Sequence, residues 1–281
     1  MIRVKDLSFS YTRHPFLENI NFTVEKGEIF GFLGPSGAGK STLQKILTGL
    51  ITNYKGNAIV NGVECKNHDS NYYENIGVDF EFPSLYDKLT ARQNLAFFGS
   101  LYSKNLRDID ELLKAVGLFQ DGDKKVSDYS KGMKSRLNFI KALLHNPDIL
   151  FLDEPTSGLD PSNSRVMKDI ILEEKRKGKT IILTTHNMVD ATELCDRVAF
   201  IVDGKLKALD TPHNLIMSKG AAKIKYTYMD EREEIRECYL NQTSEDIKLM
   251  ELIKNNKLLS IHSLEPTLSD IFVEITGKGL V

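Results

Sequence analysis

The chain has 281 residues, a length that suits about two domains of ordinary size. Hydrophobic residues make up 41% of it and charged residues 27%, proportions that exclude a long disordered polymer or a coiled rod. Its formal net charge of −2 provides no basic field to hold a nucleic-acid backbone, so we expect no nucleic-acid partner.

Short apolar runs alternate with helical periodicity and glycine-rich turns over about the first 215 residues, which predicts an α/β domain with a largely parallel sheet. The continuous apolar runs at 29–33, 149–152 and 181–183 are typical of strands covered on both faces. Residues from about 85 to 145 show mainly helical periodicity. They favour helices at 91–102, 108–116 and 131–144, and we interpret them as an inserted helical subdomain.

A second domain boundary is expected near Ser218, Lys219 and Gly220. It divides the chain into a main domain, residues 1–218, and a small C-terminal α/β extension, residues 219–281. Within the extension, the sequence indicates a strand at 223–228 and a helix at 244–255.

The sequence also predicts where the protein is found. No stretch approaches the ~18 apolar residues of a membrane span, and the first residues, MIRVKDLSFSY, carry charges where a signal peptide would have its apolar segment. The three cysteines are odd in number and far apart, which fits a reducing compartment. We therefore expect a cytoplasmic protein.

Residues 34–41 read GPSGAGKS and match the phosphate-binding pattern G-x-x-x-x-G-K-[ST]. Small residues let the backbone wrap a phosphate, and a helix that starts near Lys40 adds its positive dipole end. We expect Lys40 to reach the β- and γ-phosphates of a nucleotide, Ser41 to bind Mg²⁺ and Thr42 to contact the α-phosphate. The other residues expected to bind phosphate are Gly34, Pro35, Ser36, Gly37, Ala38 and Gly39. An apolar strand precedes the motif and a helix follows it, and this context argues against a chance glycine-rich turn.

A predicted buried strand ends in two carboxylates, in the segment ILFLDEP at 149–155. Ligands of open α/β sheets lie beyond the carboxyl ends of the strands. Asp153 is therefore expected to face the metal, and Glu154 to act as general base for a water molecule. Without the phosphate-binding loop, the two acidic residues would more simply form a solvated turn.

Further motifs follow in one order, and together they resemble the ATP-binding subunit of an ABC transporter over residues 1 to about 215. The segment Tyr129–Met133 (YSKGM) is similar to the family's signature, and SGLD at 157–160 to its D-loop. TTH at 184–186 is similar to the segment that ends in the switch histidine, here His186. Tyr11 stands where the family has an aromatic residue that stacks on adenine.

The resemblance implies a P-loop ABC ATPase cassette: a parallel-sheet core, an antiparallel β subdomain and an inserted helical subdomain. It implies that two cassettes, identical or paralogous, pack head to tail around ATP. Ser130, Gly132 and Asp160 would then contact the nucleotide at the dimer interface, and His186 would contact the γ-phosphate and hold the attacking water. The simpler alternatives are an ordinary helix N-cap for Ser130, a polar strand end for His186 and packing for Tyr11.

One residue departs from the family pattern. Glu81 stands where a glutamine is usual, in the segment IGVDFEFP at 76–83. Glutamate is a hard oxygen ligand that suits Mg²⁺, but it adds a negative charge near the phosphates and lacks the amide donor. We expect ATP and Mg²⁺ to bind, and hydrolysis or its coupling to a partner to be altered.

The resemblance also implies a membrane permease as partner, since this chain is similar to only one part of a transporter. Exposed aromatic residues after Glu81, around Phe82, Leu85 and Tyr86, would suit a partner helix, or they pack within the subdomain. The tail SLEPTLSDIFVEITGKGL at 263–280 resembles ATPases of ABC-2-type exporters. It predicts an ATPase on the inner face of the cell membrane that powers export.

Several alternatives stay open at this point. One is an ABC importer ATPase, and another is a soluble ABC ATPase of translation or DNA repair, although such proteins usually carry two cassettes. A P-loop kinase or GTPase is a third, although the N-K-x-D element of GTPases is missing. A non-enzymatic nucleotide sensor is the fourth, because of Glu81.

Overall fold

The computed structural model describes residues 1–218, 223–264 and 266–277. The chain forms two compact units, one up to Leu209 and one that begins at Asp210. The boundary expected near Ser218 is followed by residues 219–222, which lie outside the described residues, so the division at 218/219 stays a prediction.

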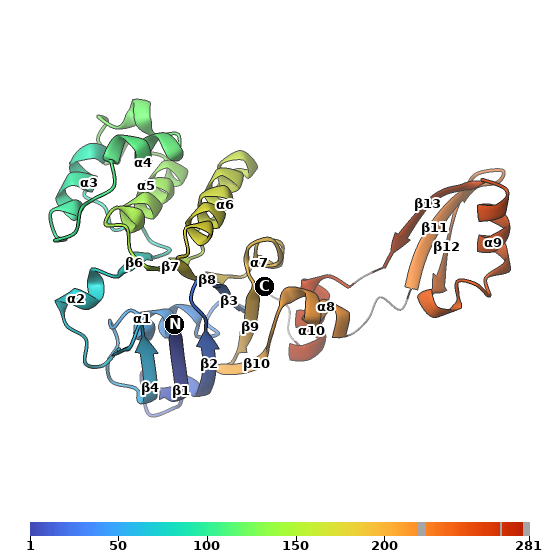
Figure 1. Ribbon diagram of the computed structural model, residues 1–281, viewed down its shortest axis with the longest axis horizontal. Helices are drawn as coiled ribbons and strands as arrows, with labels where there is room; N and C mark the ends of the chain where they lie inside the picture. The colour runs from blue at the N-terminus through green and yellow to red at the C-terminus, as the bar shows by residue number, and fades with distance from the viewer. Residues whose placement is uncertain (219–222, 265, 278–281) are drawn as a thin grey trace. The chain divides into compact units, whose positions relative to one another are not determined.

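A six-stranded sheet with the order β10-β9-β3-β8-β7-β6 forms the core of the first unit (Figure 1). All five residues of β3 and of β7, and all six of β8, are buried, which explains their continuous apolar character. Neighbouring strands from β9 to β6 pair in parallel, as predicted from the sequence. The strands are β3 (Ile29–Leu33), β6 (Ile76–Asp79), β7 (Ile149–Asp153), β8 (Thr180–Thr185), β9 (Arg197–Val202) and β10 (Lys205–Asp210).

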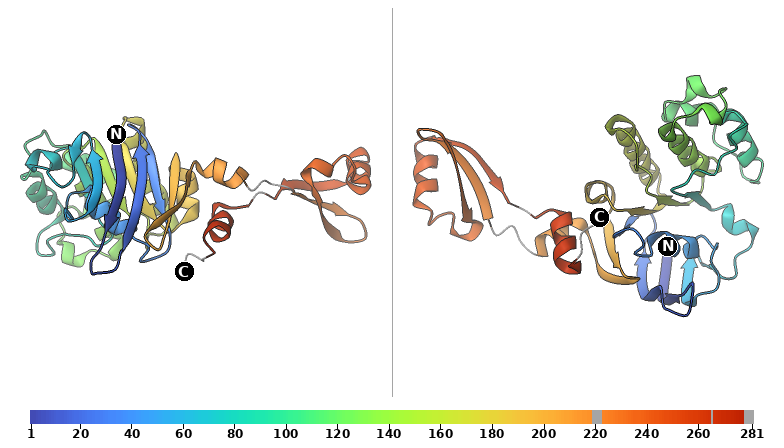
Figure 2. Two further views of the ribbon diagram at one scale, coloured as in Figure 1. Left: turned by 90° about the horizontal axis from the view of Figure 1, so that it is seen from below. Right: turned by 180° about the vertical axis from the view of Figure 1, so that it is seen from behind.

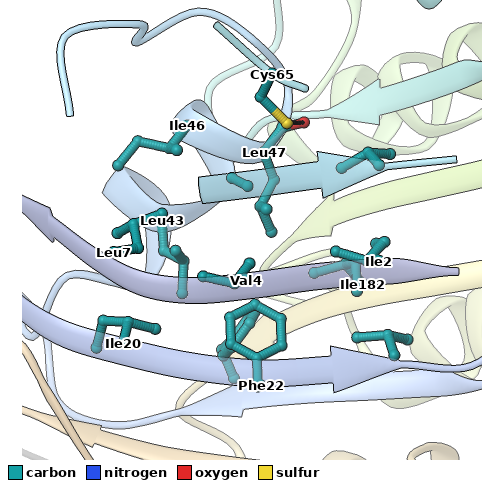
Figure 3. Close-up of a cluster of buried hydrophobic side chains, with 14 of the residues drawn as sticks. Ile2, Val4, Leu7, Ile20, Phe22, Leu43, Ile46, Leu47, Cys65 and Ile182 are labelled. Carbon is teal, nitrogen blue, oxygen red and sulfur yellow. Dashed lines mark hydrogen bonds between the residues drawn. The ribbon is translucent and has the colours of Figure 1, made fainter. Parts of the chain in front are cut away.

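A second, antiparallel sheet has the order β2-β1-β4-β5. Its alternating buried and exposed residues show that one face lies on the core. Figure 3 shows how Val4 and Phe22 from this sheet, Leu43 from helix α1 and Ile182 from β8 form one buried cluster. The strands are β1 (Ile2–Phe9), β2 (Leu17–Val24), β4 (Lys55–Val60) and β5 (Val63–Glu64).

Four helices of the first unit connect strands of its two sheets. Two of them have clear caps: Asp160 accepts backbone N–H bonds at the start of α6, and Asn187 does so at the start of α7. The four helices are α1 (Lys40–Leu47), α2 (Ser70–Tyr73), α6 (Pro161–Arg176) and α7 (Met188–Leu194).

The predicted helical subdomain is present, and Figures 1 and 2 show its helices gathered beside one another. It contains α3 (Ala91–Gly99), α4 (Ile109–Ala115), α5 (Lys131–Leu143) and the 3₁₀ turns η1 (Phe119–Asp121) and η2 (Val126–Asp128). The helix expected at 91–102 ends earlier, at Gly99, because the N–H groups of Leu101 and Tyr102 bond three residues back, to the carbonyl oxygens of Phe98 and Gly99, and tighten the last turn.

The second unit contains a three-stranded antiparallel sheet, β12-β11-β13, with helix α9 packed on one face. The expected helix at 244–255 begins later, because the Asp246 side chain accepts the Leu249 N–H and thus caps α9. Its elements are α8 (Pro212–Ser218), β11 (Lys223–Met229), β12 (Glu233–Tyr239), η3 (Leu240–Gln242), α9 (Ile247–Lys254), β13 (Leu258–Ser263) and α10 (Leu268–Thr276). Glu265 and residues 278–281, part of the tail on which the ABC-2 resemblance rests, lie outside the described residues. Among the helices that are described, none combines the length and the apolar character needed to cross a bilayer.

The first unit also buries an ionisable group that predicts a pH dependence of stability. The His145 ring is fully buried, stacks on Tyr102 with ring centroids 3.7 Å apart and places Nε2 2.9 Å from the Ile76 carbonyl oxygen. Burial lowers the pKa of His145 to about 4. In the unfolded chain the histidine binds a proton near pH 6.5. The stability that the neutral, buried His145 contributes is therefore complete above that pH and is lost as the pH falls toward 4.

We expect the free energy of unfolding to fall by roughly 1–2 kcal/mol between pH 7 and pH 5 on account of this group. Urea unfolding at the two pH values measures it. In His145→Phe the pH dependence should shrink by this amount, whereas His14→Phe, which changes an exposed histidine, should retain it. An equal pH dependence in wild type and His145→Phe would contradict the prediction.

Candidate active site

A cavity of about 550 Å³ lies where strands β3, β7 and β8 of the core sheet end. Carboxyl ends of parallel strands meet at one edge of the sheet, which is where α/β proteins bind ligands. The lining residues come from distant parts of the chain: Phe16, Ser36, Gly37, Gly39, Lys40, Ser41, Thr42, Glu81, Asp153, Glu154 and His186. The fold thus brings the glycine-rich loop, the carboxylate pair, Glu81 and His186 together, as the sequence motifs predict.

The glycine-rich loop needs glycine at two positions for different reasons. A Cβ on Gly34 would lie 2.1 Å from the Ile201 carbonyl oxygen, so no side chain fits there. Gly39, directly before α1, has φ 111°, a conformation that L-residues rarely adopt. The loop therefore passes close to β9 and then delivers the N–H groups at the start of α1 to the cavity.

Lys40 is the cation of the cavity. Its buried ammonium group donates hydrogen bonds to the carbonyl oxygens of Gly34 (2.6 Å) and Pro35 (3.0 Å). Burial lowers the pKa of Lys40, while the carboxylates of Glu154, Asp153 and Glu81 act in the opposite direction. The loop thus holds a positive charge opposite three acidic side chains.

Two aromatic residues lie beside the loop. The Tyr11 hydroxyl is 3.0 Å from the Thr42 hydroxyl oxygen, and the Tyr11 ring makes edge contacts with Phe9 and Phe16 although the residue is 59% exposed. Phe16, which was not predicted from the sequence, lines the cavity, whereas Tyr11 does not belong to the lining residues. No local motif marks Phe16, and only its position just before β2 brings it to the loop.

The carboxylate pair is held by the neighbouring strand. Asp153 of β7 pairs in register with Thr184 of β8, and the Thr184 hydroxyl donates to the Asp153 carboxylate. One residue further, Thr185 Oγ1 donates to Glu154 Oε2 at 3.2 Å, and His186 Nδ1 lies 2.8 Å from Glu154 Oε1. Neither threonine was predicted as a site residue, although both directly precede His186 in the TTH segment.

Glu154 also has an unusual backbone. Its φ is 52°, a left-handed conformation that costs energy for a residue with a side chain. Such outliers persist only where the surrounding structure holds them, and they concentrate at functional sites. The strain supports a role for Glu154 beyond packing.

Glu81 follows β6 and lines both the large cavity and a smaller one of about 70 Å³. Asp79, the last residue of β6, precedes Glu81 by two positions; it is buried and was not predicted as a site residue. Burial raises the pKa of Asp79 to about 7, against the hydrogen bond that it accepts from Asn138. The carboxyl groups of Asp79, Asp153 and Glu154 line the smaller cavity together with that of Glu81.

Comparison with known proteins identifies the family. The family model for ABC transporters matches residues 17–157, half of the chain. A fluoroquinolones export ATP-binding protein from Mycobacterium tuberculosis (strain ATCC 25618 / H37Rv) is 47% identical over 284 residues, which cover 100% of this chain and 94% of that protein. The chain belongs to the ABC transporter family.

Two further similarities agree with this assignment. A Nod factor export ATP-binding protein I from Rhizobium meliloti (strain 1021) is 33% identical over 300 residues, with 99% of this chain and 89% of that protein covered. A solved ATP-binding subunit of an ABC transporter superposes with a TM-score of 0.71 at 31% identity, covering 78% of this chain and 92% of that one. The ABC cassette predicted from the sequence is confirmed. The chain is an ATPase, and family membership excludes the kinase and GTPase alternatives.

Besides Tyr11, three residues that the ABC resemblance singled out lie outside the cavity of this single chain. Ser130 caps α5 by accepting the Met133 N–H at 3.2 Å, which is the simpler role considered for it. Gly132 is the second residue of that helix, and Asp160 caps α6 by accepting hydrogen bonds from the N–H groups of Ser162 and Asn163. Their contact with a nucleotide bound by a second cassette stays a prediction.

Proposed function

We propose that ATP binds in the 550 Å³ cavity and is hydrolysed there with Glu154 as general base. The observation that carries this proposal is the fixed Glu154 carboxylate, held by Thr185 and His186 in a cavity that also contains Lys40. The backbone N–H groups of the loop and Lys40 bind the phosphates. Glu154 takes a proton from the attacking water, and His186 orients that water. Tyr11 contributes an exposed ring beside the loop for the adenine.

The donor set of the cavity fits Mg²⁺. The Ser41 hydroxyl and the carboxylates of Glu81 and Asp153 line one space, and oxygen ligands of this kind suit a small, hard cation. When bound with ATP, Mg²⁺ supplies positive charge that offsets the phosphate oxygens. Thr184 orients Asp153 for this role by its hydrogen bond.

The proposed metal role of Glu81 gives a prediction. Because a neutral amide oxygen binds Mg²⁺ less strongly than a carboxylate, Glu81→Gln is expected to raise the Mg²⁺ concentration for half-maximal ATPase about tenfold, or roughly 1.4 kcal/mol. ATPase assays at saturating ATP over a Mg²⁺ series measure it. Glu25→Gln, at an exposed position, is the matched control. An unchanged rate and Mg²⁺ dependence in Glu81→Gln would show that this carboxylate has no such role.

We further propose that two cassettes, identical or paralogous, close around ATP and drive a membrane permease of the ABC-2 type. The named relatives are export ATP-binding proteins, which favours export over import and over a soluble role in translation or repair. In this proposal, the ATPase works on the inner face of the cell membrane.

The helical subdomain offers a surface for the permease. Phe82 is 79% exposed, and Tyr86 packs against Phe97 and Phe98 with ring centroids 5.0 and 5.8 Å apart, which leaves it half-exposed. Leu85 lies between them in the sequence and is partly buried. Such an aromatic surface directly after Glu81 suits a helix of a membrane subunit.

Site-specific crosslinking tests this surface. A photoreactive amino acid at Phe82 or Tyr86, activated in intact cells, should capture a membrane protein with several spans. The same amino acid at Val166, an exposed residue of α6, should not. Capture of no membrane protein at Phe82 and Tyr86, with the cassette present at normal levels, would refute the proposed docking surface.

A further inference from the structure

The segment that carries Glu81 is attached to helix α5 by one buried side chain, Asn138. Asn138 is 2% exposed, and its Nδ2 donates to Asp79 Oδ1 at 2.5 Å and to the Phe80 carbonyl oxygen at 3.3 Å. Its Oδ1 accepts the Ser84 N–H at 3.3 Å. The amide group thus contacts the chain on both sides of Glu81.

A second residue of α5 strengthens this attachment. Lys141, three residues after Asn138, donates from Nζ to the Ser84 carbonyl oxygen at 3.0 Å. Between the fixed residues, Glu81, Phe82 and Pro83 are exposed. Helix α5 therefore fixes the two ends of a three-residue stretch whose first member is Glu81.

Asn138 and Glu81 also line one small cavity, together with Asp153 and Glu154. Asp79 is itself fixed by the sheet, since it pairs with Leu152 of β7. Asn138 therefore connects the end of β6, the Glu81 segment and α5 next to the carboxylates of the active site. A displacement of the segment would change the distance between the carboxylates of Glu81 and Asp153.

The helical subdomain contains a second buried asparagine, whose hydrogen-bond partners do not flank Glu81. Asn94 of α3 is fully buried, accepts the Tyr86 N–H at 2.8 Å and donates to the carbonyl oxygens of Tyr86 and Thr90. Its partners lie beyond the stretch that carries Glu81. Loss of Asn94 should therefore destabilise the subdomain and leave Glu81 in place, which makes it a matched structural control.

We propose that Asn138 is a positioning residue that holds the Glu81 carboxylate in the active-site cavity. This proposal rests on the proposed role of Glu81 as a metal ligand. Residues that orient a ligand without touching the metal contribute strongly to metal affinity, commonly about tenfold or more. The hydrogen bond between Asn138 and Asp79 is buried, so its loss is not compensated by water.

Asn138→Leu removes the amide at nearly constant size. Amide hydrogen exchange should then accelerate in residues 80–84, whose Ser84 N–H loses its acceptor. Binding of Mn²⁺, used as the spectroscopic probe in the presence of a non-hydrolysable ATP analogue, should weaken about tenfold in electron paramagnetic resonance titrations. In the Glu81→Ala background, Asn138→Leu should cause no further weakening.

Two more variants keep the test independent of stability. Asp79→Leu/Asn138→Leu replaces the buried polar pair by an apolar pair, so it should fold yet bind Mn²⁺ as weakly as Asn138→Leu. Asn94→Leu should lower the melting temperature and retain the Mn²⁺ affinity of the wild type.

Three results would overturn the role of Asn138: unchanged exchange in 80–84, unchanged Mn²⁺ affinity in Asn138→Leu, or full additivity with Glu81→Ala. A failure of the proposed function looks different, because wild-type protein and Glu81→Ala would then bind Mn²⁺ equally while Asn138→Leu still changed exchange in 80–84. That outcome would limit Asn138 to a structural role and so refute the positioning proposal as well.

Discussion

Replacing Glu154 by glutamine is expected to lower the rate of ATP hydrolysis by roughly two to four orders of magnitude while ATP still binds. The amide keeps the size of the side chain, and its oxygen still accepts the hydrogen bond from Thr185. It cannot take a proton from water, however, so the step assigned to the general base fails. Steady-state ATPase assays measure the loss, and gel filtration with ATP should show a dimer that persists.

The control for this prediction is Glu251→Gln, which changes an exposed glutamate of α9. Its ATPase rate should equal that of the wild type. A rapid ATPase in Glu154→Gln would refute the assignment of the base. The same rate loss without a persistent dimer would contradict the proposal that two cassettes close around the nucleotide.

Replacing Lys40 by alanine is expected to weaken ATP binding about 100-fold or more, which corresponds to roughly 3 kcal/mol. The ammonium group is desolvated already, since it is buried and donates to the carbonyl oxygens of Gly34 and Pro35. It therefore meets a phosphate without a large further loss of hydration. Its removal leaves Asp153, Glu154 and Glu81 with no cation in the cavity lining, so they repel the polyphosphate.

Equilibrium binding of a fluorescent ATP analogue measures the effect of Lys40→Ala. Lys45→Ala, an exposed residue in the last turn of the same helix, should bind the analogue as the wild type does. Near-normal affinity in Lys40→Ala would show that the cavity does not bind the phosphates in the proposed way. Unfolding measured in parallel separates lost affinity from lost structure.

The parts of the site that were predicted from the sequence are those encoded by short, contiguous motifs. The loop from Gly34 to Ser41 has a fixed spacing because the backbone itself forms the binding surface. Asp153 and Glu154 were predictable because a fully apolar strand leads directly to them. The parallel core sheet and the helical subdomain followed from the same kind of local periodicity.

The parts that were missed depend on contacts between distant segments. Phe16, Thr184 and Asn138 reach the site only through strand register and helix packing, which a single sequence does not reveal. The predicted ends of helices were wrong for a related reason. Helix α9 begins where the Asp246 side chain accepts a hydrogen bond from the Leu249 N–H, and hydrophobic periodicity carries no information about that bond.

The register between β7 and β8 has a consequence for how ABC ATPases of this kind can vary. Asp153 and Thr184 are paired across the sheet, so Glu154 and His186 meet because of the pairing and not because of the length of chain between them. Helix α6 and the turn that follows it lie within that interval, and neither contributes a residue to the lining of the two cavities. Insertions and deletions in α6 and the turn after it can accumulate during evolution without altering the distance between the side chains of Glu154 and His186, whereas a slip of one residue in the strand pairing would separate them.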